Sequence, residues 1–172
     1  LTGLLITVSS DTELRSVVFW MMGSFANIPW QCVAIIAVVM LVSLLGLWRL
    51  IKPLNAFLLG EQACLHMGYA VQSLKWWVMG LSALMVAVAV ALVGVIGFVG
   101  LVVPHMIRLW VGPDHKIVIP LSALGGAVLL VLADLIARSL IHPAELPIGL
   151  LMALLGGPFF LMMLLKRRGF NA

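Results

Sequence analysis

Charged side chains are scarce in this chain of 172 residues, where they make up only 9% of the sequence. A soluble domain carries about 25%. Hydrophobic residues account for 64%, and apolar runs near or above twenty residues recur. A helix of that length crosses a hydrocarbon core of about 30 Å. We therefore predict an all-α, polytopic membrane helical bundle of about five spans in contact with the lipid bilayer.

Catalytic and nucleotide-binding motifs are also missing. The sequence contains no Gly-x-Ser-x-Gly elbow, no His-Glu-x-x-His pair, no paired intramembrane aspartates and no Gly-x-x-x-x-Gly-Lys-Ser/Thr phosphate loop. We expect no enzyme activity and no cofactor, and any ATP-driven step would need another polypeptide. The ten Lys and Arg residues outnumber six acids, but they lie between apolar spans. They indicate membrane topology rather than binding to nucleic acid.

Metal-binding patterns are equally sparse. Cys32 and Cys64 are the two cysteines, and their spacing fits neither a metal site nor a disulfide framework, so both are interpreted as small packing residues. His105 and His115 fall at different depths, whereas a metal path would need several ligands that converge. Structural histidines held by hydrogen bonds are the favoured interpretation, and we expect no metal site.

Five membrane spans are predicted: 30–50, 75–95, 97–111, 116–140 and 147–165. Residues 1–9 look like the end of a further helix, and 11–22 like an amphipathic surface helix. Because the first residue is Leu and lies in an apolar stretch, we expect a fragment of a longer protein. The 97–111 span is short, about 22 Å as a helix, and contains Pro104. We expect it to be buried in a bundle, with Gly97 and Gly100 allowing close helix approach.

The basic residues predict the orientation. Threading the spans alternately places eight of them on one face: Arg49, Lys52, Lys75, Arg108, Lys116, Lys166, Arg167 and Arg168. Only Arg15 and Arg138 fall toward the other face. By the positive-inside rule the richer face is cytoplasmic, and so is the C-terminus.

Residues 53–68, which we call the knob, form the longest part of the chain that is unsuited to hydrocarbon. Leu54 and Phe57 follow helical spacing, and we expect Asn55 to cap that first turn. Gly60 interrupts the run, and a second short helix should end at Gly68. Two short helices hinged at a glycine would make a compact cytoplasmic surface. The two helices could form a structured loop or a surface that a partner protein binds.

Asp134 and Arg138 are four residues apart with the acid first, the favourable order for a helical ion pair. The pairing would make burial of both charges tolerable. Alternatively, Arg138 reaches the outer surface and meets an acidic partner.

The chain resembles a known family, the permease subunits of ABC importers for iron–siderophore, haem and cobalamin. The matching stretches are Gly97-Phe-Val-Gly-Leu-Val-Val-Pro-His105 with Arg108, Gly112-Pro-Asp-His-Lys116, Pro120-Leu-Ser122, Ala133-Asp-Leu-Ile-Ala-Arg138, Glu145-Leu-Pro-Ile-Gly149, Gly156-Gly-Pro-Phe-Phe160, and in the knob Leu54-Asn55, Leu59-Gly-Glu61 and Leu65-x-x-Gly68. The similarity covers essentially the whole chain. Family members are about twice as long and have ten spans, so the chain resembles the C-terminal half of a type II importer permease. Gly157 stands where alanine is common.

The resemblance implies a single transmembrane permease domain over 1–172 in a bacterial inner membrane. The implied partners are a second permease copy, two cytoplasmic ABC ATPases and a periplasmic substrate-binding protein. The knob becomes the element that couples to the ATPase, through Asn55, Leu59, Gly60, Glu61, Ala63, Leu65 and Gly68. Arg138 becomes a docking residue for the binding protein. The remaining motif positions imply helix packing: Gly97, Gly100, Pro104, His105, Asp134, Pro147, Gly156 and Pro158.

The implied function is import of a metal chelate by ATP-driven alternating access. The choice among siderophore, haem, cobalamin and oxyanion is not made by these residues. One alternative function is an ABC permease for divalent metal ions, which would need several His and Asp side chains close together in the spans. Another alternative is an intramembrane hydrolase, but the sequence lacks the nucleophile and base motifs of that class. A structural membrane subunit that transports nothing is the rival from another class.

Overall fold

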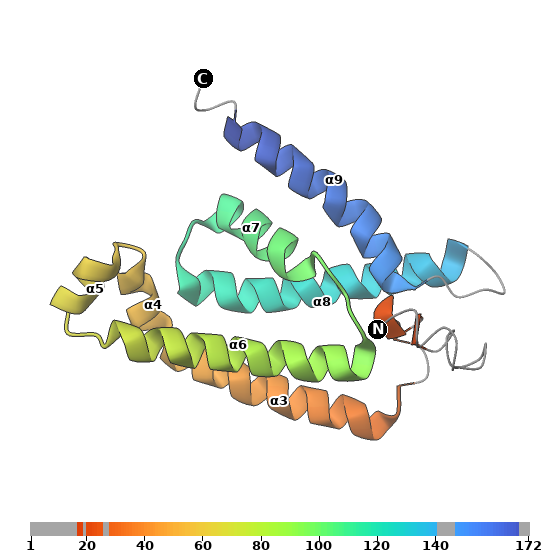
Figure 1. Ribbon diagram of the computed structural model, residues 1–172, viewed down its shortest axis with the longest axis horizontal. Helices are drawn as coiled ribbons and strands as arrows, with labels where there is room; N and C mark the ends of the chain where they lie inside the picture. Colours follow the sequence, from red (N-terminus) through yellow and green to blue (C-terminus); the bar gives the residue numbers. More distant parts are fainter. Residues whose placement is uncertain (1–16, 19, 26–27, 141–146, 169–172) are drawn as a thin grey trace, which may run out of the picture. The chain divides into compact units, whose positions relative to one another are not determined.

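The computed structural model describes residues 17–18, 20–25, 28–140 and 147–168. Every regular element within these ranges is a helix, which confirms the all-α prediction. Figure 1 labels the helices α3 (Trp30–Arg49), α4 (Ile51–Phe57), α5 (Glu61–His66), α6 (Val71–Val93), α7 (Val99–Val111), α8 (His115–Leu140) and α9 (Ile148–Arg168). The end of a helix predicted at 1–9, most of the surface helix at 11–22, and Arg15 and Glu145 lie outside the described residues.

Three of the helices described are long and apolar enough to cross a membrane: Trp30–Arg49, Val71–Val93 and the His115–Ser139 part of α8. Each coincides with a predicted span, although α6 begins four residues before Lys75. The short span predicted at 97–111 is the 13-residue helix α7, about 20 Å long. Helix α9 has 21 residues, about 31 Å, and its apolar part is Ile148–Met162.

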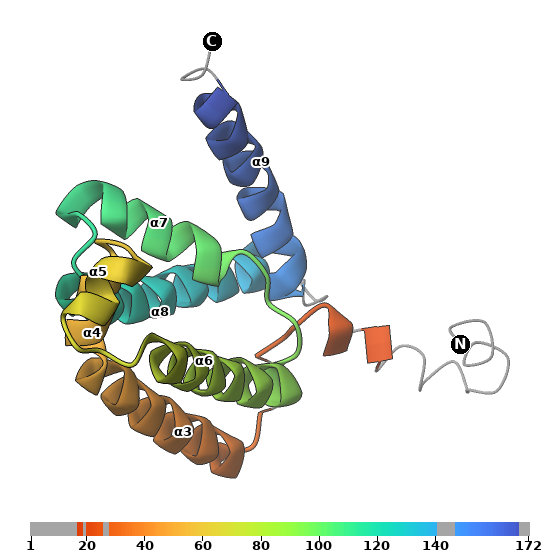
Figure 2. The same ribbon diagram turned by 60° about the vertical axis from the view of Figure 1, so that its left-hand side comes forward.

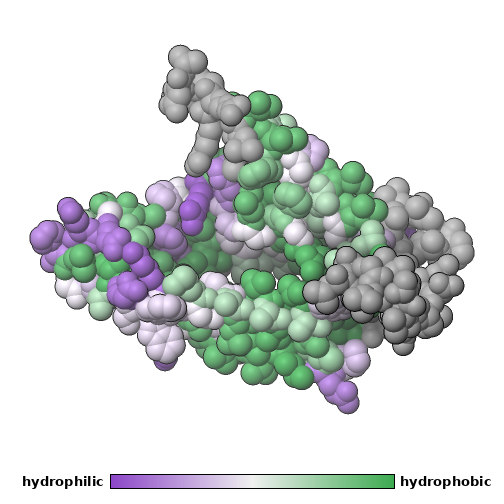
Figure 3. Space-filling model, in the orientation of Figure 1, coloured by the Kyte–Doolittle hydropathy of each residue, from purple (hydrophilic) through white to green (hydrophobic). Residues whose placement is uncertain are grey.

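The described residues divide into two compact units. The first contains residues 28–92 and 103–128. Within it α3 and α6 run side by side, and the short helices α4 and α5 lie at one end of the pair (Figure 1, Figure 2). Gly46 makes the close approach possible, because a Cβ there would lie 2.9 Å from Leu81 Cδ1. The hydrophilic surface gathers over α4 and α5, and apolar surface covers much of α3 and α6 (Figure 3).

The second unit contains 93–102, 129–140, 147–168 and the described residues before 26. Its core joins α8 and α9 through four buried residues: Ala133, Ala137, Ile148 and Met152. The first turn of α9 leaves backbone N–H groups without a helical partner. Two of them donate to the segment before α3: Ile148 to the Gly23 carbonyl at 3.1 Å and Gly149 to that of Met22 at 3.0 Å. These bonds hold the start of α9 in place.

Candidate functional site

The hinge predicted at Gly60 is present. Gly60 separates α4 from α5 with φ 107° and ψ 158°, a backbone conformation essentially restricted to glycine. A second positive φ, 84° at Gly68, follows α5, as expected for the glycine after a helix end. The knob is therefore two short helices joined at a glycine joint, as its sequence predicts.

The prediction that Asn55 caps the first knob helix is wrong. Helix α4 begins at Ile51, with Leu50 in the N-cap position. Pro53 falls in its first turn, where the missing N–H costs no hydrogen bond. Asn55 therefore lies inside α4, and its side chain is free to bond to another part of the chain.

Asn55 bonds to the turn that precedes α8. Its Nδ2 donates to Asp114 Oδ1 at 2.6 Å, and its Oδ1 accepts the backbone N–H of His115 at 2.9 Å. His115 Nδ1 lies 2.8 Å from the same oxygen, which agrees with the interpretation of His115 as a hydrogen-bonded structural histidine. We call Asn55, Asp114 and His115 the polar cluster. It ties the knob to the start of a membrane span 59 residues away.

Asp114 is also the cap of α8, a role the sequence analysis did not assign. Its Oδ1 accepts the backbone N–H of Lys116 at 2.9 Å, as an N-cap aspartate does. This bond, followed by that from Asn55, lowers the pKa of the Asp114 carboxyl below its usual 3.8, because both donors favour the ionised form.

The lowered pKa predicts a pH-dependent stability. A carboxyl with a depressed pKa stabilises the fold above its unfolded pKa, and this contribution is lost as the pH falls through the folded pKa. Asp114→Asn should therefore lower the melting temperature at pH 7, and the difference from the wild type should shrink below about pH 4. Thermal unfolding of both proteins in detergent checks this. A difference that stays constant down to pH 3 would contradict the assignment, and Gln72→Ala, the loss of an exposed amide on α6, serves as control.

A second contact fixes α5 to α6. Lys75 Nζ lies 2.8 Å from Glu61 Oε1 and 5.7 Å from the centroid of the Phe57 ring. The ion pair is substantially exposed, so its contribution is about 1 kcal/mol or less. Its value is positional, because it links the first residue of α5 to a residue of a membrane span.

The knob has a small core and an apolar outer surface. Cys64 is fully buried with Ala56 and Val71, and its Sγ lies 3.8 Å from the Pro53 carbonyl oxygen. In contrast, Leu59 is 68% and Leu65 54% exposed, and Leu58 and Met67 are exposed with them. The predicted coupling residues Gly60, Glu61 and Gly68 are also exposed, Ala63 is half-buried, and Asn55 is half-buried in the polar cluster. Exposed apolar groups on an otherwise polar protrusion are typical of a docking surface.

The predicted ion pair of α8 is confirmed: Arg138 Nε lies 2.9 Å from Asp134 Oδ2. The Arg138 side chain remains 52% exposed, which leaves it accessible to a further partner.

The residues predicted for helix packing behave differently from one another. Gly156 packs against the Phe98 side chain so closely that an added Cβ would overlap it, and Pro147 is buried just before α9. Pro104 and Pro158 lie inside α7 and α9, and His105 is half-buried. At Gly97 and Gly100 a Cβ would meet nothing within 4 Å. For those two glycines helix packing stays a prediction.

The fold and the apolar helices define a class, a multi-pass helical membrane protein. The sequence matches the FecCD transport family over residues 1–166. The chain belongs to that family, which confirms the resemblance.

Individual permeases and a solved transporter structure are also similar to this chain. The chain is 44% identical over 167 residues to the hemin transport system permease protein HmuU of Yersinia pestis, covering 96% of this chain and 50% of the relative. It is 41% identical over 174 residues to the vitamin B12 import system permease protein BtuC of Vibrio cholerae, covering 96% and 51%. A solved structure described as an inward-facing conformation of a metal-chelate type ABC transporter matches with a TM-score of 0.86 and 39% identity, over 95% of this chain and 53% of that one. The chain therefore spans about half the length of the proteins it matches.

Proposed function

We propose that this chain is part of the permease subunit of an ATP-driven importer that moves a metal chelate, of the haem, cobalamin or iron–siderophore type, across a bacterial inner membrane. Support comes from the relatives, which are named as hemin and vitamin B12 permeases. The observation that carries the proposal is the knob, a hinged protrusion with exposed apolar side chains in a chain of this family.

In this proposal residues 1–172 belong to one transmembrane domain, and the knob and C-terminus face the cytoplasm. The knob docks on a separate ATPase through Leu59, Leu65 and their exposed neighbours, and the two copies of the ATPase perform the hydrolysis. The polar cluster and the Lys75–Glu61 pair hold α4 and α5 against the ends of two spans. A displacement of the knob would then be passed directly to α6 and α8. A second permease copy and a periplasmic binding protein complete the assembly.

The test is transport by the assembled system. The full-length permease, its ATPase and its binding protein are reconstituted in vesicles, and ATP-dependent accumulation of labelled haem, cobalamin and a ferric siderophore is measured. Accumulation of one chelate that needs both ATP and the binding protein supports the proposal. A complex that assembles and hydrolyses ATP but accumulates none of the three chelates contradicts the proposed substrate class.

Arg138→Glu should weaken docking of the binding protein by about tenfold or more, because the change replaces an attractive charge with a repulsive one at a rim position. The affinity of the binding protein for the reconstituted permease checks this. Asp134→Asn is the matched control, since it removes the helical ion pair and leaves the Arg138 charge in place. Equal weakening by both variants would assign Arg138 to the ion pair alone.

A further inference from the structure

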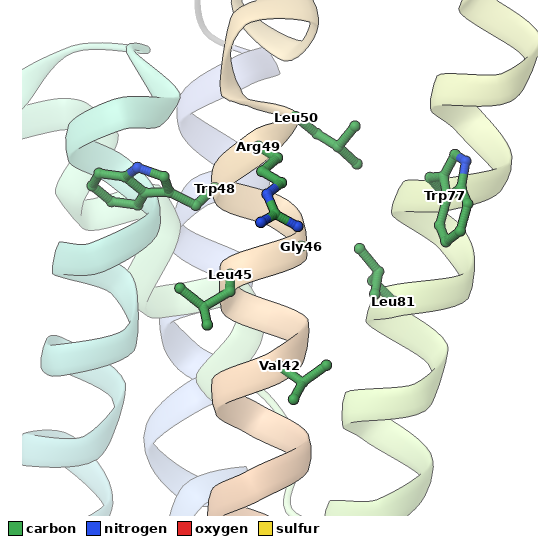
Figure 4. Close-up of a pocket in the computed structure, with 8 residues that line it drawn as sticks. All are labelled: Val42, Leu45, Gly46, Trp48, Arg49, Leu50, Trp77 and Leu81. Atoms are coloured by element: carbon green, nitrogen blue, oxygen red, sulfur yellow. The ribbon is translucent and has the colours of Figure 1, made fainter.

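A groove lies between α3 and α6 at their ends nearest the knob (Figure 4). It has a volume of about 620 Å³, within the range of about 300–1,000 Å³ typical of ligand sites. Val42 projects from α3 toward α6, and Leu81 projects from α6 toward α3. Both helices belong to the same compact unit, so the groove is formed within one part of the chain.

The groove combines three kinds of side chain. Val42, Leu45 and Leu81 are its apolar lining residues, and the Leu81 side chain packs on Gly46 of α3. Trp48 and Trp77 line it as well and are exposed. Indoles prefer the level of the lipid headgroups. The groove therefore passes from hydrocarbon to the headgroup layer along its length.

Arg49 is the charged residue among those that line this groove. The ion pairs among the described residues are Lys75–Glu61 and Arg138–Asp134, so the structure shows no acidic group opposite Arg49. The Arg49 residue is exposed, and the planar fork of donors on its guanidinium matches a phosphate. Basic pockets between spans on the cytoplasmic side are where anionic headgroups bind.

We propose that this groove binds one anionic phospholipid, with its phosphate on Arg49 and an acyl chain along Val42 and Leu81. The inference rests on the membrane orientation given under the proposed function. A protein segment laid over the groove would bury the Arg49 charge against apolar side chains at a large cost, whereas a lipid brings its own counter-charge. The bound lipid would brace the two helix ends, at Arg49 and Val71, between which the knob is held.

The test measures lipid binding directly and does not depend on transport. The full-length permease in mild detergent is titrated with phosphatidylglycerol or phosphatidylcholine, and bound lipid is counted by native mass spectrometry. Phosphatidylglycerol should bind more tightly, and Arg49→Gln should weaken it about fivefold. Lys52→Gln is the matched control, because Lys52 carries the same charge three residues away and does not line the groove. Equal weakening by the two variants, or equal binding of the two lipids, would overturn the proposal.

A second variant separates lipid binding from binding of a free phosphate. Val42→Trp fills the apolar part and leaves Arg49 in place, so it should reduce phosphatidylglycerol binding several-fold. Its melting temperature reports whether the fold is intact. Water-soluble glycerophosphoglycerol should not compete. A phosphatidylglycerol with a photoreactive acyl chain should label the groove between Val42 and Leu81, and labelling confined to other helices would overturn the site even if the importer proves active.

Discussion

Gly60→Ala is expected to reduce ligand-stimulated ATP hydrolysis by the assembled importer about tenfold. The backbone at Gly60, with φ 107° and ψ 158°, costs a residue with a Cβ about 1–3 kcal/mol. Each 1.4 kcal/mol is a factor of ten in population, so the substitution removes most of the population with the native hinge. The exposed apolar groups on either side of the hinge would no longer form one surface. Steady-state hydrolysis with and without loaded binding protein measures the effect.

The expected effect at Gly60 comes from backbone strain and not from steric overlap, because a Cβ there would meet nothing within 4 Å. Gly80→Ala is therefore the matched control. Gly80 also has open space around its Cβ position, but it lies inside α6, where alanine is the better helix former. Its stimulated rate should stay within about twofold of the wild type. A Gly60→Ala importer with full stimulation would show that the hinge transmits nothing.

The glycine joint could be predicted from the sequence because its cause is local. Gly60 and Gly68 lie where the backbone has positive φ. The runs before Gly60 and between the two glycines are too short to span a membrane. Asn55 could not be placed in the same way. An asparagine before a short helical run is a good cap, but its true partners, Asp114 and His115, are about 60 residues away in the sequence. Contacts between distant segments leave no periodic signal.

The same limit applies to helix packing. The run that contains Gly97 and Gly100 predicts close helix contacts, yet a Cβ at either position would meet nothing within 4 Å, whereas Gly46 packs on Leu81 and Gly156 on Phe98. Phe98 has φ 66°, a conformation that few residues other than glycine adopt. The lengths of the apolar helices α3, α6 and α8 could be predicted from the sequence, since they depend on composition alone. The identity of each helix's neighbour depends on the three-dimensional path of the chain.

Gly94→Val is expected to have the largest effect on folding, a loss of about 3 kcal/mol or more. Gly94 has φ 84°, and an added Cβ would overlap the backbone carbonyl oxygen of Trp20. A left-handed backbone costs about 1–2 kcal/mol for a residue with a Cβ, and overpacking adds about 1–3 kcal/mol. The neighbouring bond from the Ser24 N–H to the Val93 carbonyl, 3.0 Å long, fixes the two segments together. Denaturant unfolding in detergent measures the loss.

Gly80→Val is the matched control for this prediction. Gly80 lies inside α6, where a Cβ would meet nothing within 4 Å, and the same side chain should cost less than about 1 kcal/mol there. A clash with a side chain can be relieved by a change of rotamer, but the obstacle at Gly94 is a backbone carbonyl. Relief would require the segments around Trp20 and Val93 to separate, and with them the carbonyls of Met22 and Gly23 that hold the first turn of α9. Equal losses for the two variants would mean that these segments are not packed together in the membrane.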